Sequence, residues 1–318
     1  MTYEHDLSII VVAWNVLDLV DECLAHVRAS EDGLRKQILF VDNGSSDGTP
    51  ELVASRYPEV TLLRAGSNLG FIRANNLAYP EATGRYVLML NSDAFVGPKT
   101  FERTVAFMDE HPQYGVLGCR LVGRDGAPQP SARNFPTPWR SFVSNLGLDS
   151  RFGFRGIDDL DQDVHVVREC DWVTGCYLLA RKHALDELDW FLTEDYFMYN
   201  DDNDLCLRLR RRGWKTACHP EQIVHVGGGN AERLGALTEG GRQIDALSIE
   251  STYIYYRRNY GLPRVLSQYF WRLSFRATQV LKAAIRMRRD IGIAHELRSV
   301  AAETRILLRT GFGVNRIH

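Results

Sequence analysis

The amino-terminal third of the chain alternates short apolar runs with stretches whose apolar residues recur every three or four positions. The runs are rich in β-branched residues and predict strands, whereas the stretches between them predict helices. Strands are expected at residues 8–13, 37–41, 60–64 and 85–90, and helices at residues 17–29, 49–57, 70–78 and 98–111. This alternation predicts an α/β fold with a doubly wound, mostly parallel sheet flanked by helices.

The rest of the chain has a less regular pattern. Residues 123–155 are rich in Gly, Pro and Ser and predict loops. The sequence then predicts a strand at 172–180, a helix at 201–212, two short strands at 215–217 and 222–226, and a flexible break at the glycines 227–229. From residue 246 onward the apolar positions have a helical period, which predicts a carboxyl-terminal helical appendage.

Composition is typical of a globular protein, but charge is unevenly distributed along the chain. Of 318 residues, 45% are hydrophobic and 25% are charged, which excludes wholesale disorder. Residues 250–318 contain 13 Lys and Arg against 4 Asp and Glu, a balance of +9. Because the whole chain has a net charge of −2, residues 1–249 have a balance of −11. The basic segment predicts a partner that carries phosphate, either nucleic acid or an anionic membrane.

The cysteines and the amino terminus indicate a reducing compartment. Six cysteines occur without CxxC spacing, which predicts buried free thiols rather than a metal site or disulfides. Acidic residues stand near the amino terminus where a signal peptide needs basic ones. No apolar run approaches the roughly 18 residues of a membrane span. We therefore expect a cytoplasmic protein.

Polar residues follow the predicted strands, at the edge where parallel sheets bind ligands. They are Asn15, Asp42, Asn43, Asn68, Asn91, Ser92 and Asp93. Asp42 and Asn43 lead into a turn rich in Gly and Ser, whose side chains and amides can contact a nucleobase, a sugar or a phosphate. The alternative interpretation of this turn is a cap for the helix that follows.

A carboxylate after the strand at 85–90 predicts a cation site. Asp93 can bind a hard divalent cation, which prefers oxygen ligands and can bridge to a diphosphate. His225, within the strand at 222–226, is the candidate second ligand, or alternatively a histidine of the core. The GxGxxG, P-loop and HExxH motifs are absent, so the sequence lacks the usual signatures of dinucleotide binding, P-loop phosphate transfer and zinc proteolysis.

Three carboxylates, Asp201, Asp202 and Asp204, begin the helix predicted at 201–212. Acidic residues are favoured at a helix amino terminus, so part of this cluster is explained by capping. Three carboxylates exceed what a cap needs. Crowded carboxylates raise one another's pKa, which suits a general base near neutral pH.

The segment Gly44-Ser45-Ser46-Asp47-Gly48 matches the GxSxG nucleophile elbow of serine hydrolases. This match makes an α/β hydrolase with Ser46 as nucleophile an alternative function. Only one predicted strand precedes the strand that leads into the motif, whereas a nucleophile strand belongs in mid-sheet after several strands, and no HGGG-type oxyanion loop comes before it. The hydrolase is therefore the secondary hypothesis.

Seven segments of the chain together resemble one known family. They are, in order, VVAWN, VDNGSSDGT, NLGFIRANN, MLNSDAFV, DWVTGCYLLARKHAL, DYFMYNDDNDLCLRLRRRGW and HVGGG. Their order and spacing resemble the family 2 inverting glycosyltransferases, and most of all the rhamnosyltransferases that act on lipid-linked or polysaccharide acceptors. The resemblance covers about residues 7–230. It implies the GT-A fold, in which a nucleotide-binding half-sheet is fused to an acceptor-binding half.

The resemblance also implies roles for particular residues. A divalent cation, Mg²⁺ or Mn²⁺, would bind Asp93 and His225, although Asn91 replaces the first acid of the family's DxD motif. Asp202 would be the general base, beside Asp201 in place of the family's glutamate. The acceptor would contact Trp172, Gly175 and Cys176. The donor would contact Ala13, Asn15, Asp42, Asn43, Asn68, Gly70, Asn75, Asn91, Ser92 and Asp93.

The implied reaction is inverting transfer of a sugar, with rhamnose from dTDP-rhamnose as the leading candidate, to a hydroxyl of a glycan or lipid-linked glycan. UDP-linked hexoses stay open as donors. The alternatives are the serine hydrolase and a catalytically inactive sugar-nucleotide-binding protein. The expected catalytic domain spans residues 1–230, with a nucleotide-binding part at about 1–95 and an acceptor-binding part at about 96–230, and a basic, aromatic-rich helical region follows at 231–318.

This basic region predicts a peripheral protein on the inner face of the cytoplasmic membrane. Aromatic residues between 253 and 275 are interleaved with arginines, which is typical of an interfacial helix on anionic lipid. The alternative is that these helices pack on the catalytic domain, or on a second copy in a homodimer. Nucleic acid would use the same charges, but the acidic body argues against it.

Overall fold

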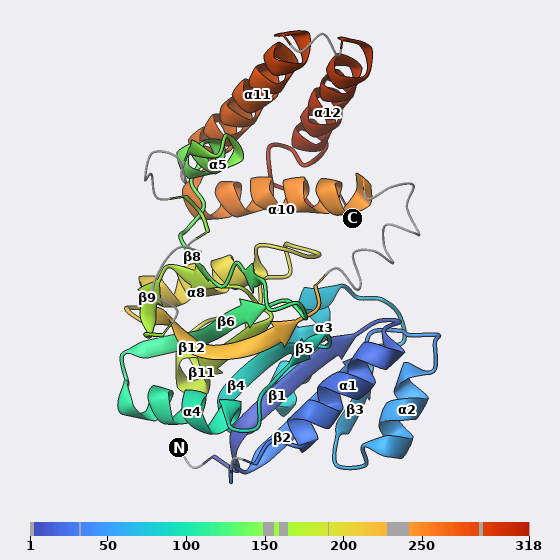
Figure 1. Cartoon of the computed structure of the whole chain (residues 1–318), viewed down its shortest axis with the longest axis vertical. Coiled ribbons are helices and arrows are strands. Elements are labelled where there is room, and N and C mark those ends of the chain that lie inside the picture. The colour runs from blue at the N-terminus through green and yellow to red at the C-terminus, as the bar shows by residue number, and fades with distance from the viewer. Residues whose placement is uncertain are drawn as a thin grey trace.

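The computed structural model describes residues 3–31, 33–148, 156–158, 165–189, 191–227, 242–285 and 289–317. In this part of the chain a layered α/β body carries three long helices at its carboxyl-terminal side (Figure 1). The first elements are β1 (His5–Ala13), α1 (Leu17–Arg28), β2 (Lys36–Asp42), α2 (Thr49–Arg56), β3 (Thr61–Arg64), α3 (Phe71–Ala78), the 3₁₀ turn η1 (Tyr79–Glu81), β4 (Gly84–Asn91), β5 (Ala94–Phe95) and α4 (Thr100–Glu110). They confirm the predicted alternation of strands and helices, with ends displaced by a few residues.

The second half of the body adds antiparallel strands to the sheet. Its elements are β6 (Tyr114–Val122), β7 (Pro128–Gln129), β8 (Ala132–Arg133), α5 (Pro138–Asn145), β9 (Arg168–Cys170), β10 (Trp172–Val173), β11 (Tyr177–Arg181), α7 (Lys182–Asp186), α8 (Asp201–Arg211) and β12 (Lys215–His225). The main sheet runs in the order β3-β2-β1-β4-β11-β6-β12-β5. β1 to β4 pair in parallel, whereas β11 is antiparallel to both β4 and β6. The predicted α/β class is confirmed, with a mixed sheet.

Strand β1 shows why the sheet is covered on both faces. Ile9 and Val11 pack on one face with residues of α1 and α4, while Ile10 and Val12 pack on the other with residues of α3. Successive side chains of a strand point to opposite faces, so an unbroken apolar run needs helices on both sides. The parallel strands β1, β2 and β4 therefore end at one edge, where their polar loops gather.

The structure corrects the predictions for the middle of the chain. β6 was not predicted, and the strand expected at 172–180 is interrupted, because β10 pairs with β8 while β11 joins the main sheet. The two strands expected at 215–217 and 222–226 are one strand, β12, whose register shifts between His219 and Gln222.

The region 123–155, predicted as loops, contains regular elements in its described part. These elements are β7, β8 and α5, and Thr137 caps α5 by accepting a hydrogen bond from the Arg140 N–H. Of the three glycines expected to break the chain, Gly227 (φ +67°) is described and the other two lie outside the described residues.

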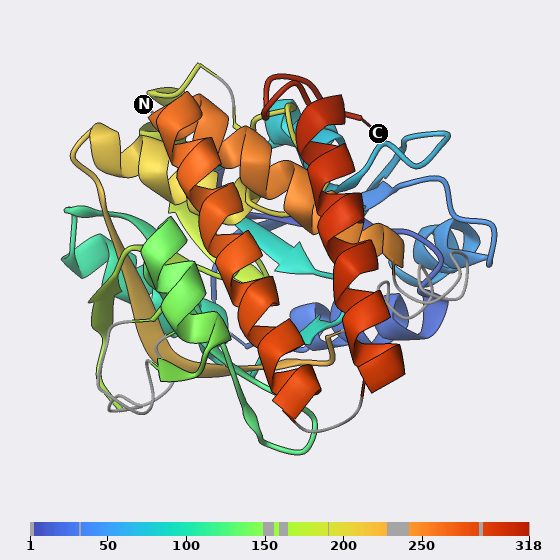
Figure 2. The ribbon, with the colours of Figure 1, turned by 90° about the horizontal axis from the view of Figure 1, so that it is seen from above.

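The carboxyl-terminal helices are α10 (Arg242–Tyr260), α11 (Leu262–Ile285) and α12 (Arg289–Arg309). α10 lies against the body, where Ser251 Oγ donates to the carbonyl of Met198 (2.7 Å). α11 and α12 form an antiparallel hairpin, seen side by side in Figure 2, in which the hydroxyls of Tyr269 and Thr304 share a hydrogen bond (2.7 Å). The predicted helical appendage is confirmed.

Burial corrects the interpretation of the aromatic residues in this appendage. Tyr253, Tyr255 and Tyr256 are at most 1% exposed, so they stabilise the packing of α10 and are not at a membrane surface. Three of the arginines are paired with acidic side chains, as Arg258–Asp195, Arg272–Glu303 and Arg276–Glu296. Arg286 and Arg288 lie outside the described residues. The alternative that α10 packs on the body is therefore correct for this helix.

Two expectations about the whole chain concern its thiols and its helices. All six cysteines are free, and five of them are buried, as their spacing predicts. Within the described ranges, no helix has both the length and the apolar character needed to cross a bilayer.

Candidate active site

The loops after β1 and β2 are joined through Asn15. This residue has a left-handed backbone (φ +54°), its N–H donates to Ser45 Oγ (3.1 Å), and its Oδ1 accepts from the Ser46 N–H (2.8 Å). Asp42 is 4% exposed and accepts from the Ser45 N–H (3.0 Å). The Asn43 N–H donates to the carbonyl of Ala13 (2.9 Å). Hydrogen bonds thus join the predicted residues Asn15, Asp42 and Asn43 into one continuous surface at the edge of the sheet, which we call the wall.

Asn43 extends this wall to the loop before α3. Its Nδ2 donates to Asn68 Oδ1 (3.1 Å), and its Oδ1 accepts from the Leu69 N–H (2.8 Å). Asn68 Oδ1 also accepts from the Gly70 N–H (3.0 Å). Gly70 has φ +82°, and a Cβ there would lie 2.9 Å from Phe197, so this position requires glycine.

Asp93 and His225 are brought together by the pairing of β5 with β12. Gln129 Nε2 donates to the carbonyl of His225 (3.0 Å), which orients the amide so that its Oε1 accepts from His225 Nδ1 (2.7 Å). His225 Nε2 then carries a lone pair, and it lies 3.5 Å from Asp93 Oδ1. Two lone pairs at this distance repel unless a proton or a metal ion lies between them, and a histidine oriented through its second nitrogen is typical of a metal ligand.

This donor set has two protein ligands. Within the described residues no group of three or more His, Cys, Asp or Glu side chains converges. Asn91, in the place of a further acid, contributes its N–H to the carbonyl of Cys176 (2.9 Å). The residues present therefore fit a divalent cation whose remaining ligands come from substrate and solvent.

Helix α8 starts from a strained turn. Tyr199 (φ +67°) and Asn200 (φ +61°) are consecutive non-glycine residues in the left-handed region. Each such residue costs about 1–3 kcal/mol and persists only where its surroundings hold it, commonly at functional sites. Here the turn begins the helix directly at Asp201 and Asp202, both of which line a cavity.

Both oxygens of Asp202 are held by backbone amides. Its Oδ1 accepts from the Asn203 N–H (2.8 Å), and its Oδ2 accepts from the Gly175 N–H (3.1 Å). Gly175 lies between β10 and β11, in the interruption that the sequence did not predict. The interruption of the strand therefore leaves a backbone N–H free to donate to the carboxylate.

Burial raises the pKa of both carboxyl groups. Burial, together with the neighbouring charge of Asp202, raises the pKa of Asp201 to about 8. Burial also raises the pKa of Asp202, against the opposing effects of its backbone hydrogen bonds and of Arg133. The two groups interact and titrate as a pair. A carboxylate with a raised pKa accepts a proton more readily near neutral pH.

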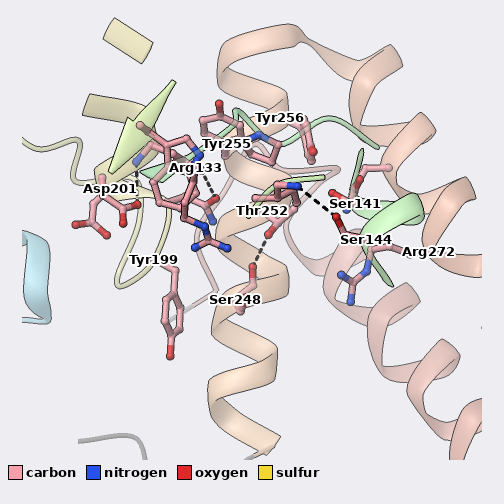
Figure 3. A pocket seen from close by; sticks show the side chains of 17 residues that line it. Arg133, Ser141, Ser144, Tyr199, Asp201, Ser248, Thr252, Tyr255, Tyr256 and Arg272 are labelled. Atoms are coloured by element: carbon pink, nitrogen blue, oxygen red, sulfur yellow. Dashed lines mark hydrogen bonds between the residues drawn. The ribbon is translucent and has the colours of Figure 1, made fainter. Parts of the chain in front are cut away.

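A cavity of about 370 Å³ opens beside these carboxylates (Figure 3). Its walls come from β8, α5, β10, the start of α8, α10 and α11. Trp172 lines it, with Nε1 donating to the carbonyl of Asn134 (2.9 Å) and the Arg133 guanidinium 4.5 Å from its ring centroid. The cavity is within the range of about 300–1,000 Å³ found for small-molecule sites.

Comparison with known proteins identifies the family. Residues 8–171, more than half of the chain, match the family described as Glycosyl transferase family 2. The chain belongs to this family. The match includes the wall around Asp42 and Asn43 and the turn at Asp93, and it ends just before β10. The predicted resemblance is confirmed.

Relatives of this family 2 glycosyltransferase include two curated proteins. It is 29% identical to an N-acetylglucosaminyl-diphospho-decaprenol L-rhamnosyltransferase of Mycobacterium tuberculosis over 208 residues, which are 59% of this chain and 66% of the relative. It is 23% identical to the low-salt glycan biosynthesis hexosyltransferase Agl10 of Haloferax volcanii, over 70% of this chain and 68% of the relative. The chain thus spans about two thirds of the length of these relatives.

A solved structure has the same fold. The mannosyltransferase PcManGT from Pyrobaculum calidifontis, in complex with GDP-Man and Mn²⁺, matches with a TM-score of 0.52 at 16% identity, over 98% of this chain and 76% of that chain. This likeness confirms the GT-A fold of the glycosyltransferase.

The resemblance assigns two residues to the site whose side chains are buried away from the cavity. Cys176 is fully buried in the core, so its thiol is not part of the cavity wall of this glycosyltransferase. Asn75 is 1% exposed, and its Nδ2 donates to the carbonyl of Phe71 within α3 (2.9 Å). We therefore assign neither side chain to a substrate contact.

Several residues of the site escaped the sequence analysis. Gln129, which orients His225, stands in a stretch predicted as loop, and no motif marks it. Arg133 lies in the same stretch. No motif marks the α10 and α11 residues of the cavity either, because they lie more than 35 residues beyond the end of α8 in the sequence. These residues of α10 and α11 come close to Asp201 and Asp202 only in the folded chain.

The structure contradicts the alternative that the protein is a serine hydrolase with Ser46 as nucleophile. Ser46 is exposed, its N–H donates to Asn15, and its Oγ lies 3.5 Å from the same Asn15 Oδ1. In the described part of the glycosyltransferase no histidine is hydrogen-bonded to Ser46. A nucleophilic serine needs a base within hydrogen-bond reach, so the GxSxG match has no catalytic meaning here.

The raised pKa of Asp201 predicts a pH-dependent effect on stability. The folded protein holds this proton up to about pH 8, whereas the unfolded chain releases it near the ordinary value of 3.8. The stability that the protonated group contributes is therefore complete below about pH 4 and is lost as the pH rises towards 8. The Asn side chain of Asp201→Asn cannot ionise. This substitution should therefore raise the free energy of unfolding by more than about 1 kcal/mol at pH 8, and the gain at pH 5 should be smaller than the gain at pH 8.

Urea unfolding at both pH values measures this effect. The exposed Asp189→Asn is the control for the loss of one negative charge. An equal gain at pH 5 and pH 8 would contradict the assigned pKa shift.

Proposed function

We propose that the protein is an inverting glycosyltransferase that moves a sugar from a nucleotide diphosphate donor to a hydroxyl of a glycan or lipid-linked glycan. The observation that carries this proposal is Asp202, a carboxylate fixed by two backbone amides at the wall of a cavity of suitable size. Family membership supports the reaction type. The rhamnosyltransferase relative supports rhamnose, from dTDP-rhamnose, as the sugar and cell-wall or polysaccharide synthesis as the context.

In this mechanism Asp202 acts on the acceptor. It takes the proton of the acceptor hydroxyl while that oxygen attacks the anomeric carbon from the face opposite the leaving nucleoside diphosphate, which inverts the configuration. The Gly175 and Asn203 amides keep the carboxylate oriented during this step. Asp201, whose pKa is raised to about 8 by burial and by the charge of Asp202, keeps its proton near neutral pH and leaves Asp202 as the charged member of the pair.

The donor lies at the wall built by Asn15, Asp42, Asn43 and Asn68. Asp93 and His225 would hold a divalent cation, Mg²⁺ or Mn²⁺, there. Such a cation supplies charge that offsets the negative charge developing on the diphosphate. Gln129 keeps the lone pair of His225 Nε2 directed at Asp93. The Mn²⁺ and GDP-Man of the mannosyltransferase with the same fold support this assignment.

Domain organisation follows from these roles. We assign residues 1–95 to the donor, residues 96–230 to the acceptor, and the helices that follow to a further wall of the acceptor cavity. This last assignment extends the acceptor site beyond residue 230, because α10 and α11 contribute to the cavity.

Nucleotide sugars together with Mn²⁺ or Mg²⁺ should stabilise the protein. A ligand at about 100 times its Kd raises the free energy of unfolding by about 2.7 kcal/mol. Thermal shifts with dTDP-rhamnose, UDP-hexoses and GDP-mannose, each with the metal or with EDTA, would identify the donor. His225→Ala should remove the metal-dependent part of the shift. Stabilisation by none of these donors would contradict the function, and donor binding without acceptor-dependent nucleotide release would indicate an inactive binding protein.

We also propose that α11 and α12 hold the protein at the inner face of the cytoplasmic membrane. α11 exposes an apolar stripe with a spacing of four residues, Leu262, Leu266 and Phe270, and α12 exposes Leu297 and Leu308. The surrounding basic segment would attract anionic lipid by about 1 kcal/mol per engaged residue. Because α10 is buried against the body, this function is limited to the hairpin.

Flotation with liposomes tests the membrane proposal. Binding should require anionic lipid, weaken with salt, and decrease strongly in the double variant Leu266→Ser with Phe270→Ser. Leu77→Ser, which alters an exposed leucine of α3, is the matched control. Unchanged flotation of the double variant would contradict the proposal, and a loss of dimers in light scattering instead would indicate a second copy as the partner.

A further inference from the structure

The cavity beside Asp202 has a fixed cation on its other side. Arg272 of α11 lines the cavity, and its Nε donates to Oε1 of Glu303 on α12. Glu303 is 1% exposed and also accepts from the Tyr253 hydroxyl (2.9 Å). The buried carboxylate thus holds one edge of the guanidinium. The terminal nitrogens of Arg272 make no further hydrogen bond among the described residues, so their donors are available to a ligand.

Helix α5 places a hydroxyl donor on the same side. Ser144 Oγ accepts from the Ile157 N–H (3.2 Å), so its own proton remains to be donated. Figure 3 shows Ser141 and Ser144 beside Arg272, and Asp201 on the opposite side of the cavity in this view. Arginine and serine donors at one place are the groups that bind phosphate oxygens.

The wall between these two sides contains unpaired acceptors. Gln268 Oε1 and Asn203 Oδ1 are buried and have no hydrogen-bond partner in the described part of the chain. Both residues line the cavity and are at most 3% exposed. A buried acceptor without a partner costs about 1–3 kcal/mol, and a ligand rich in hydroxyl groups would supply the missing donors.

We propose that the cavity binds a glycosyl phosphate or diphosphate acceptor, with its phosphate on Arg272 and Ser144 and its sugar hydroxyl at Asp202. This inference rests on the proposed function and names the acceptor class of the same site. The sugar hydroxyls would meet Gln268 and Asn203.

The surroundings of the phosphate end favour a lipid-linked acceptor. On α5, Trp139 and Phe142 contact Trp271, with ring centroids 5.3 Å and 4.7 Å apart, and Trp139 is 49% exposed. This aromatic surface adjoins Ser144 along α5 and Arg272 along α11. A prenyl chain attached to the phosphate would leave the cavity over it.

Acceptor kinetics of the full chain test the phosphate subsite. The first variant is Arg272→Gln, and the second adds Glu303→Gln so that no buried carboxylate is left unpaired. The matched control is Arg276→Gln with Glu296→Gln, an equivalent pair one helical turn away and outside the cavity. The acceptors are a glycosyl diphosphate with a short prenyl chain, its water-soluble methyl diester, and the phosphate-free methyl glycoside of the same sugar.

Both Arg272 variants should raise KM for the two diphosphate acceptors about 10- to 100-fold, as expected for the loss of a charge-assisted hydrogen bond. KM for the donor and for the phosphate-free glycoside should stay unchanged, as should all constants of the control. Preference for the prenyl acceptor would identify the lipid as the source of the phosphate, and equal use of the methyl diester would identify a soluble one. An unchanged KM for the diphosphates, or an equal rise for the phosphate-free glycoside, would overturn the subsite while leaving the proposed function intact.

A binding measurement separates the subsite from catalysis. Calorimetric titration with inorganic pyrophosphate, with the donor site first saturated by a nucleoside diphosphate and Mg²⁺, should detect binding to wild type and a loss of at least about 10-fold in affinity in the double variant. If no acceptor supports transfer, the proposed function fails, and this titration still decides whether Arg272 binds phosphate.

Discussion

Asp202→Asn is expected to reduce sugar transfer about 10²- to 10⁴-fold, the contribution that a general base typically makes. The amide has nearly the same shape as the carboxylate, but it cannot accept the proton of the acceptor hydroxyl. One of the two backbone donors, Gly175 or Asn203, loses its acceptor, so a modest loss of stability of about 1 kcal/mol should accompany the change. The measurement is the rate of acceptor-dependent release of nucleoside diphosphate.

The affinity for the donor should be almost unchanged in this variant, because Asp202 lies in the cavity and not at the wall around Asp42. Ser46→Ala should transfer sugar like wild type and is the control against a hydrolase. Activity of Asp202→Asn within about 10-fold of wild type would show that another group takes the proton.

The first half of the fold was predictable because its signals are local. Apolar runs in β1, β2 and β4 reflect burial on both faces, and they alternate with helical periods in the sequence itself. β6 escaped prediction because it contains Gly115 and Gly118. A Cβ at Gly115 would lie 2.8 Å from Trp214, and one at Gly118 would lie 2.6 Å from Val173. Tertiary contacts therefore require both glycines.

The site was predictable only where a strand end or a helix start concentrates polar residues. Asp42 and Asp93 became candidates in this way, as did the acidic cluster at residues 201–204, whereas the choice of Asp202 within that cluster rests on the family resemblance. The hydrogen bond from Gly175 to Asp202 required knowledge of how an apolar run is interrupted. The cavity wall from α5, α10 and α11 was not predictable, because nothing in a single sequence indicates that Arg272 packs opposite residues 201 and 202.

Asp204→Ala is expected to destabilise the protein by about 3–5 kcal/mol, the usual cost of removing one partner of a buried ion pair. The Asp204 side chain is 1% exposed and accepts from four donors, Arg208 Nε (2.9 Å), Thr193 Oγ1 (3.0 Å), Tyr196 Oη (3.2 Å) and Asn259 Nδ2 (2.8 Å). Without the carboxylate, Arg208 loses its ion-pair partner, while its Nη2 still donates to the carbonyl of Phe191 (2.7 Å).

The same carboxylate connects α10 to the start of α8, since Asn259 belongs to α10. Its loss should therefore loosen the helices that complete the acceptor cavity, and KM for the acceptor should rise more than KM for the donor at temperatures where the variant is folded. Urea unfolding gives the loss of stability. Asp195→Ala, which breaks the exposed pair Arg258–Asp195 between α10 and the loop before α8, is the matched control and should cost less than about 1 kcal/mol. An equal loss in the free energy of unfolding in the two variants would show that Asp204 does not stabilise the packing of α10 more than an exposed ion pair does.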